Sequence, residues 1–195
     1  MRTKPLGTSD LTVTELCLGT MTYGSQTPED DAHAQVSAAL DAGINFMDAA
    51  EMYPVNPVRA ETVGLTEEIV GRWFAGPGKG RRDDWVVATK ITGANGGFCR
   101  GGRGIDGETI RAAVDASLTR LQTDVIDLYQ LHWPNRGSYH FRQYWSYDPS
   151  RQDRDATRAN MIEVLEAMSE LRAAGKVRHF GLSNESAWGT AEWLR

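Results

Sequence analysis

Residues 85–131 contain one complete strand–helix–strand unit: WVVAT (85–89), DGETIRAAVDASLTRL (106–121) and VIDLYQL (125–131). The first and last runs are short and rich in β-branched and aromatic residues, which favours strands. In the middle run, apolar side chains recur every three or four positions from Ile110 to Leu121, so it predicts an amphipathic helix. Asp106 stands where its carboxylate can cap that helix. The stretch therefore predicts two parallel strands joined by a crossover helix.

The same alternation extends to both sides of this unit. Further strand-like runs cover residues 16–20, 44–48 and 177–182, and helix-like stretches cover about 27–43, 66–74 and 161–171, the last ending at Gly175. Pro28 and Gly43 mark the two ends of the first helix. Five strands alternating with four helices, with no hairpin among the five, predict a parallel α/β sheet with right-handed crossovers.

Chain length narrows the architecture. Each unit takes roughly 40 residues, so a closed barrel of eight units needs well over 250, against the 195 present. The sheet is therefore either open with five strands or the first part of an eight-stranded barrel. Outside the repeat, the runs around Lys4–Leu6 and Leu11–Val13 predict a small hairpin that turns at residues 7–10.

Composition excludes several functional classes. The chain has 21 Lys+Arg and 26 Asp+Glu, a net charge of -5, which removes the basic footprint of a nucleic-acid binder. It contains no run of eighteen apolar residues and no apolar segment behind Met1 that would mark a signal peptide. We therefore expect no membrane span and a cytoplasmic location.

The cysteine pattern agrees with a reducing compartment. Cys17 and Cys99 form neither a CxxC pair nor a disulfide framework. We expect Cys17 in the core of the first strand and Cys99 as an exposed thiol in the glycine-rich loop of residues 93–107.

Polar side chains gather where the predicted strands end. In parallel α/β sheets these ends open onto one face, where functional groups are carried. Here the strand ends and the positions just after them carry Asp48, Glu51, Tyr53, Lys90, His132, Trp133, Ser183 and Asn184. We expect these groups to converge at one mouth, with Glu51 bracing the turn that leads to Tyr53.

The set suggests proton transfer from a phenol. Free tyrosine has a pKa near ~10, and a cation within ~4 to 6 Å favours its anion, a role open to Lys90 paired with Asp48. His132 can hydrogen-bond the oxygen of a bound carbonyl and orient it. A carbonyl acceptor also needs a hydride, which no side chain supplies, so this chemistry implies a nicotinamide cofactor.

Five segments carry a family resemblance: GTMTYG (19–24), GINFMDAAEMY (43–53), ATK (88–90), DLYQLHWP (127–134) and GKVRHFGLSN (175–184). Together they resemble the aldo-keto reductases, most closely the Tas-like branch. The resemblance implies a (β/α)₈ TIM barrel that binds NADPH without a Rossmann domain and reduces aldehydes or ketones. The family's last three strands have no counterpart, so residues 1–195 are predicted to be a partial barrel domain, truncated to about its first five βα units.

The resemblance also assigns roles. Tyr53 matches the proton donor, Lys90 and Asp48 its activating pair, and His132 the orienting residue. The cofactor-binding positions, by resemblance, are Gly19, Thr20, Met21, Asp48, Ser183 and Asn184.

Three other signals lead to weaker hypotheses. The GxGxxG pattern at 102–107 does not directly follow a strand, so we interpret it as a loop over the mouth rather than a Rossmann fingerprint. The aromatic-rich segment 133–147 is either one wall of a substrate pocket or packing on the rim, with Trp133 the best candidate for substrate contact. His140 has no partner at short ligand spacing, so no metal site is predicted.

The expected partner is thus a small-molecule carbonyl, with no nucleic acid and no membrane; the sequence defines neither which carbonyl nor the oligomeric state. Two alternatives to an NADPH-dependent oxidoreductase stay open: a non-enzymatic, nicotinamide-cofactor-binding regulatory subunit and an inactive truncated remnant.

Overall fold

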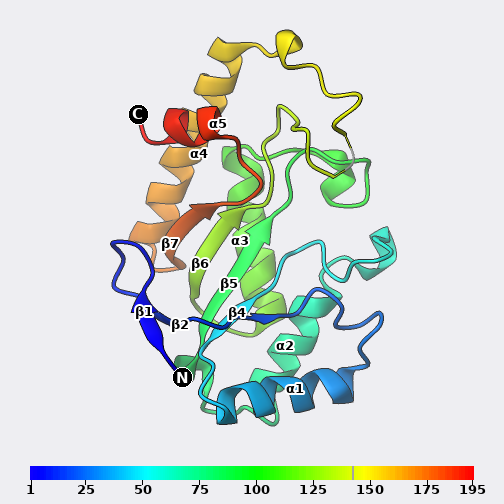
Figure 1. The fold of residues 1–195 in the computed structure, drawn as a ribbon, viewed down its shortest axis with the longest axis vertical. Helices are drawn as coiled ribbons and strands as arrows, with labels where there is room; N and C mark the ends of the chain where they lie inside the picture. The colour runs from blue at the N-terminus through cyan, green and yellow to red at the C-terminus, as the bar shows by residue number, and fades with distance from the viewer. Residues whose placement is uncertain (142) are drawn as a thin grey trace.

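The computed structural model describes residues 1–141 and 143–195 and has a five-stranded parallel sheet at its centre (Figure 1). Each strand pairs with the next one in sequence, which confirms the predicted sheet. Its strands are β3 (Leu18–Gly19), β4 (Phe46–Asp48), β5 (Val86–Ile91), β6 (Ile126–Leu131) and β7 (Val177–Leu182). The register aligns Asp48, the last residue of β4, with Ala88, Leu128 and His179 in the neighbouring strands. Because all five strands are parallel, their carboxyl ends lie on one side of the sheet.

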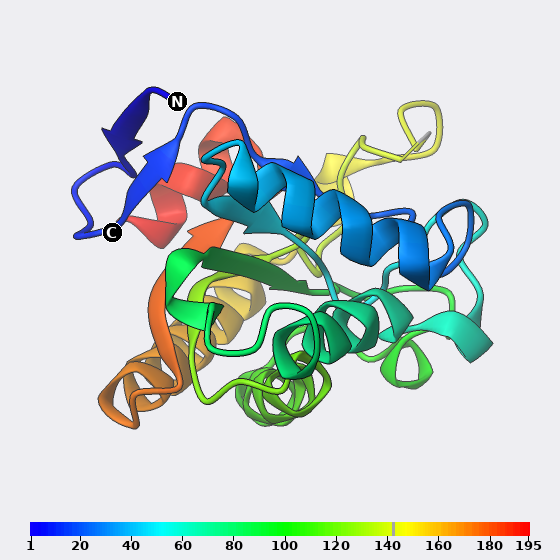
Figure 2. The ribbon, with the colours of Figure 1, turned by 90° about the horizontal axis from the view of Figure 1, so that it is seen from below.

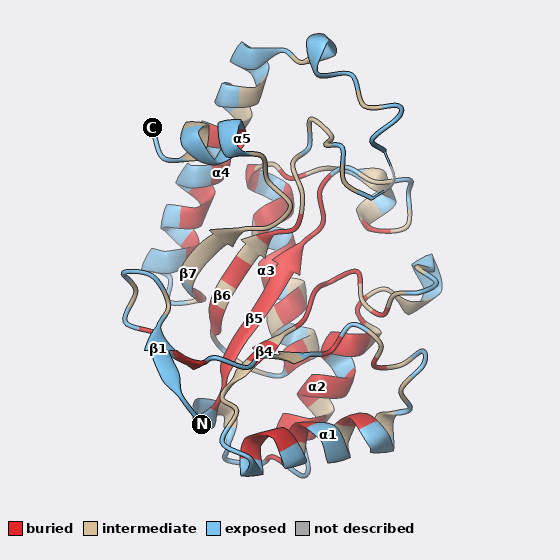
Figure 3. Ribbon diagram, in the orientation of Figure 1, coloured by how far each residue is buried: buried red, intermediate tan, exposed pale blue. Residues whose placement is uncertain are grey.

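Helices cover one face of this sheet. The described helices are α1 (Glu29–Asp41), α2 (Leu65–Ala75), α3 (Gly107–Leu121), α4 (Arg154–Ala173) and α5 (Ala187–Trp193), with 3-10 turns η1 (Ala60–Thr62), η2 (Arg82–Asp84), η3 (Arg100–Gly102) and η4 (Pro149–Arg151). The first four helices follow the strands in an arc (Figure 2). Between helices and sheet lies the main core, and β5 is buried along its whole length (Figure 3).

Local signals explain where the helices begin. The Asp106 side chain accepts from the Thr109 backbone N–H at 2.7 Å, and the Thr109 hydroxyl accepts from the Asp106 N–H at 2.8 Å, which confirms the predicted cap. The fourth helix begins at Arg154 and not near residue 161, because the Asp153 carboxylate caps a first turn that has no apolar stripe. The short α5 was not predicted. In the described part of the chain, no helix has the length and apolarity needed to cross a membrane.

A glycine sets the distance between α2 and α3. A Cβ at Gly71 would overlap the carbonyl oxygen of Arg120 and lie 2.9 Å from the carbonyl carbon of Leu121. Backbone atoms cannot rotate away, so Gly71→Ala should lower the free energy of unfolding by about 2 to 3 kcal/mol, as measured by urea denaturation. Gly96, which has open space around it, is the control. An unchanged urea midpoint for Gly71→Ala would contradict the close approach of the helices.

The predicted N-terminal hairpin is confirmed. Strands β1 (Thr3–Pro5) and β2 (Thr12–Thr14) pair antiparallel. Leu11 and Val13 pack with Phe46 and Val86, the first residues of β4 and β5, in a second apolar cluster. In the hairpin turn, the Asp10 carboxylate contacts Arg178 at 2.9 Å and His179 at 2.6 Å, both on β7. The hairpin therefore covers the end of the sheet opposite the predicted site.

Both cysteine predictions were wrong. Cys17 is exposed: it precedes the edge strand β3, and the next residue, Leu18, takes the face that packs on the main core, so Cys17 lies on the opposite face. Cys99 is 3% exposed, because the side chain of Asn95 hydrogen-bonds the backbone of residues 93, 97 and 99 and folds the loop over the thiol. Burial raises the pKa of the Cys99 thiol to about 11.

Candidate active site

The turn after β4 brings Tyr53 back toward the end of β5. The Ala49 N–H donates to the Ala88 carbonyl at 2.8 Å, and the Glu51 N–H donates to the Lys90 carbonyl at 3.1 Å. The Tyr53 N–H then closes the turn onto the Ala50 carbonyl at 3.0 Å. The turn is thus attached to the strand that carries Lys90.

The structure brings together the four residues predicted to do the chemistry. Lys90 Nζ donates to Asp48 Oδ2 at 2.6 Å and to the Ala49 carbonyl at 2.7 Å, and it lies 3.5 Å from the Tyr53 hydroxyl. The other carboxylate oxygen of Asp48 accepts from the Gln130 side chain at 3.2 Å. The His132 ring packs edge-on to the Tyr53 ring with centroids 5.8 Å apart. A lysine cation therefore sits between a carboxylate and a phenol.

Burial determines the protonation states at this site. It raises the pKa of Tyr53 to about 12, with the negative charge of Asp48 adding to the effect. The expectation that Lys90 lowers the pKa of this phenol was wrong for the structure described, because desolvation and the carboxylate outweigh a cation 3.5 Å away. Burial also lowers the pKa of Lys90, and the Asp48 charge opposes that shift. At neutral pH the phenol keeps its proton.

His132 is a buried, neutral imidazole. Burial, helped by the charge of Lys90, lowers its pKa to about 3. We expect its ring NMR shifts to stay constant between pH 8 and 5, where an ordinary histidine, with a pKa of about 6.5, takes up its proton. Because unfolding restores that ordinary pKa, the unfolded chain binds the extra proton and this group costs stability as the pH falls below about 6.5. A ring titration near pH 6.5 would contradict this assignment.

Glu51 braces the turn that leads from Asp48 to Tyr53, as predicted. Its carboxylate accepts from the Thr92 N–H, just beyond β5, and pairs with the guanidinium of Arg100 in the glycine-rich loop. The side chains are 4% and 17% exposed. Sequence reasoning missed Arg100, because nothing in the local pattern marks it as the partner of a residue 49 positions away.

The predicted cofactor positions lie at the same strand ends. Asn184 adopts a left-handed backbone (φ 53°), and its side-chain amide donates to the His132 carbonyl at 2.9 Å and to the Ser183 hydroxyl at 3.0 Å. Space is open above Gly19, where no atom lies within 4 Å of a Cβ position. The Thr20 hydroxyl is buried and donates to the Asp48 carbonyl at 2.9 Å, whereas Met21 is exposed. Gly19 thus leaves free space beside Asp48, its partner on β4, and Ser183 and Asn184 present polar groups beside His132.

A mostly apolar cavity of about 350 Å³ is lined by residues that directly follow or precede two of the site residues in sequence, among them Trp133 and Met52. Trp133 forms part of its wall, packs on His132 with ring centroids 4.9 Å apart and donates its indole N–H to the Ala94 carbonyl at 3.0 Å. Phe141 lines the same cavity. Of the other aromatics in segment 133–147, Tyr139, Tyr144 and Trp145 are exposed. Residue 142 of the segment, which is not aromatic, lies outside the described residues. One part of the segment thus forms a pocket wall, and another part faces solvent.

The structure also bears on the GxGxxG run and on possible metal ligands. The GxGxxG run starts eleven positions after the end of β5 and extends from the last residue of η3 to the first residue of α3. A Rossmann fingerprint begins directly at the end of a strand, so the run does not match one. Among residues 1–141 and 143–195, no three His, Cys, Asp or Glu side chains are grouped to hold a metal ion.

Comparisons with known proteins agree with this geometry. Residues 15–195 match the Aldo/keto reductase family. The chain is 44% identical over 190 residues to Protein tas from Escherichia coli, covering 95% of this chain and 53% of that protein. It is 31% identical over 194 residues to norsolorinic acid reductase B from Aspergillus parasiticus, covering 92% and 42%. The chain spans about half the length of the curated relatives it matches.

A solved structure supports the same assignment. The holo form of the aldo-keto reductase AKR11C1 from Bacillus halodurans superposes with a TM-score of 0.73 at 35% identity, covering 100% of this chain and 54% of that one. Family match, identity and fold agree, and the chain belongs to the aldo/keto reductase family.

Proposed function

We propose that this chain carries the proton-transfer site of an NADPH-dependent oxidoreductase that reduces aldehydes or ketones to alcohols. The observation that carries the proposal is the position of Lys90 Nζ, 2.6 Å from Asp48 and 3.5 Å from the Tyr53 hydroxyl. Family membership supports oxidoreductase activity in general. We further propose that the five parallel strands correspond to the first five of an eight-stranded barrel, and that residues 1–195 form part of that one domain.

The residues at the mouth fit a nicotinamide group. Asn184 uses its amide N–H₂ on His132 and Ser183, which leaves its carbonyl oxygen able to accept from a carboxamide. The open space above Gly19 allows a flat ring system to approach the backbone closely. When bound, the reduced nicotinamide would supply a hydride to the carbonyl carbon.

The side chains complete the reduction. His132, held neutral, donates its single N–H to the carbonyl oxygen and orients it. Tyr53 gives its proton to the same oxygen, so hydride and proton together convert the carbonyl into an alcohol. The ammonium of Lys90 stabilises the phenolate left behind, and Asp48 keeps that ammonium charged and directed. Solvent then returns a proton to Tyr53.

Steady-state consumption of NADPH with a reactive aldehyde, followed at 340 nm, tests the proposal. Consumption that depends on the aldehyde supports it. Binding of NADPH without consumption would instead establish the regulatory-subunit alternative. A chain that neither binds NADPH nor unfolds cooperatively on heating would be the inactive remnant.

Trp133 is expected to contact the substrate. Replacing it by alanine removes an aromatic contact worth about 1.5 kcal/mol, so Trp133→Ala should raise KM for an aryl aldehyde about 10-fold. The control is Trp145→Ala, because that indole is 90% exposed on the same loop. If both variants change KM equally, Trp133 has no specific contact with substrate.

A further inference from the structure

Two neighbouring loops hold groups that must act together. The segment after β6 begins with His132, and the segment after β7 begins with Ser183 and Asn184. Two hydrogen bonds already join them, from the Ser183 N–H to the Leu131 carbonyl and from the Asn184 amide to the His132 carbonyl, each 2.9 Å. Under the proposed function, one segment orients the carbonyl and the other holds the nicotinamide.

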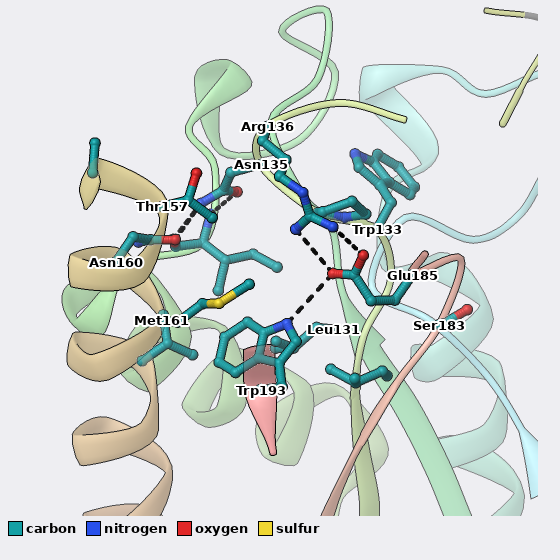
Figure 4. A pocket seen from close by; sticks show the side chains of 15 residues that line it. Leu131, Trp133, Asn135, Arg136, Thr157, Asn160, Met161, Ser183, Glu185 and Trp193 are labelled. Atoms are coloured by element: carbon teal, nitrogen blue, oxygen red, sulfur yellow. Dashed lines mark hydrogen bonds and ion pairs between the residues drawn. The ribbon is translucent and has the colours of Figure 1, made fainter. Parts of the chain in front are cut away.

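A buried ion pair links the same two loops a few residues further on. Arg136 Nη1 donates to Glu185 Oε2 at 3.0 Å, and Arg136 Nη2 donates to Glu185 Oε1, so the pair is bidentate (Figure 4). The side chains are only 10% and 5% exposed. Glu185 also accepts from the Ser186 N–H at 2.6 Å and from the Trp193 indole at 3.4 Å. This geometry fixes both the distance and the orientation of the loops.

The surroundings are shaped to hold this pair. The guanidinium of Arg136 lies 5.1 Å from the centre of the Trp188 ring. A Cβ on Gly189 of α5 would overlap both Glu185 Oε1 and Arg136 Nη2, so the helix makes room by having no side chain there. Burying two charges gains little net stability, because desolvation offsets their attraction. We therefore expect the pair to contribute mainly by fixing the distance and orientation of the two loops, and little to the free energy of unfolding.

We propose that Arg136 and Glu185 are positioning residues, which fix the loop of Ser183 and Asn184 against the segment of His132. This inference rests on the proposed function. The ion pair closes a short ring of contacts. The chain connects His132 to Arg136, the ion pair connects Arg136 to Glu185, and the preceding residue, Asn184, donates a hydrogen bond to the His132 carbonyl. With the ring closed, the nicotinamide site and the carbonyl-orienting imidazole keep a constant separation. Small errors in that separation are costly for transfer between two bound groups.

The first test measures the link itself and needs no turnover. In Arg136→Met, amide hydrogen exchange of residues 183–186 should become faster, while exchange in α3 and β5 stays unchanged. Gly189→Ala, which displaces the pair without removing a charge, should have the same local effect. The control is Arg158→Met, because Arg158 pairs with Glu192 at 2.8 Å and joins α4 to α5 without touching either loop. Unchanged exchange at 183–186 in both test variants would overturn the proposal.

The second test separates positioning from general damage. Arg136→Met should lower kcat about 10-fold and raise the primary isotope effect with deuterated NADPH, because hydride transfer becomes slower than product release. The NADPH Kd should change by less than about 3-fold, since Ser183 and Asn184 remain. The kcat of the double variant Arg136→Met/Glu185→Gln should be no lower than that of Arg136→Met.

A lower kcat with an unchanged isotope effect would overturn the positioning role. Absence of turnover in the unsubstituted protein would refute the proposed function. The hydrogen-exchange experiment would still show whether the Arg136–Glu185 pair holds the two loops together.

Discussion

Tyr53→Phe is expected to abolish carbonyl reduction. The substitution removes one oxygen, whose hydrogen-bond partner among residues 1–141 and 143–195 is Lys90 Nζ at 3.5 Å. A positioned general acid contributes about 10²- to 10⁴-fold, so kcat should fall by about 10³-fold. Cofactor binding should stay nearly intact, because Asn184, Ser183 and Gly19 are untouched. Fluorescence titration with NADPH and steady-state kinetics measure the two effects separately.

A second tyrosine offers a matched control for this prediction. Tyr23 is 1% exposed, and its hydroxyl is buried with no hydrogen-bond partner among the described residues. Tyr23→Phe should therefore leave kcat unchanged and cost no stability, since no hydrogen bond is lost. If Tyr53→Phe reduced NADPH binding as much as turnover, the proton-donor assignment would fail.

Lys90→Met should have the second-largest effect. It removes the cation beside the phenol and leaves Asp48 Oδ2 and the Ala49 carbonyl without their donor. We expect kcat to fall by about 10²-fold or more, because the phenolate formed on proton donation loses its stabilising charge. The free energy of unfolding should fall by about 2 kcal/mol, less than for a fully buried pair because the Asp48 side chain is 31% exposed.

A double variant separates the chemistry of Lys90 from its part in folding. Lys90→Met/Asp48→Asn removes both charges, so most of the stability should return while kcat stays low. Urea denaturation and steady-state kinetics on the same samples measure both quantities. As a control, Lys176→Met breaks an exposed pair with Asp115 and should cost less than about 1 kcal/mol. Recovery of kcat in the double variant would show that the ammonium is dispensable.

Much of the architecture follows from local patterns. The spacing of Ile110, Val114 and Leu121 and the carboxylate of Asp106 are properties of neighbouring residues, so helix α3 and its cap could be predicted from the sequence. The parallel sheet and the gathering of Asp48, Lys90 and His132 at its strand ends follow from strand–helix alternation and its handedness. Their side-chain roles come from the family resemblance and stay predictions.

What could not be predicted depends on contacts between distant residues. The burial of Cys99 results from the hydrogen bonds of Asn95, and the raised pKa of Tyr53 results from desolvation in the folded chain. The burial of Cys99 and the pKa of Tyr53 therefore cannot be predicted from the spacing of residues in the sequence. Two ion pairs, Glu51 with Arg100 and Arg136 with Glu185, each join residues 49 positions apart. Any exposed arginine and glutamate would produce the same local sequence signal.

The N-terminal hairpin closes the end of the sheet opposite the predicted site. Leu11 and Val13 seal the sheet at the end where β4 and β5 begin, while Asp10 anchors the same hairpin to β7. Exposed residues in the loops at the opposite end can consequently be substituted without disturbing the apolar cluster of Leu11, Val13 and Val86. Under the proposed function, exposed positions such as Tyr144 and Trp145 are therefore the places to diversify substrate preference. Arg100 and Arg136, which hold buried ion pairs on the same loops, and residues 3–14 should be left intact.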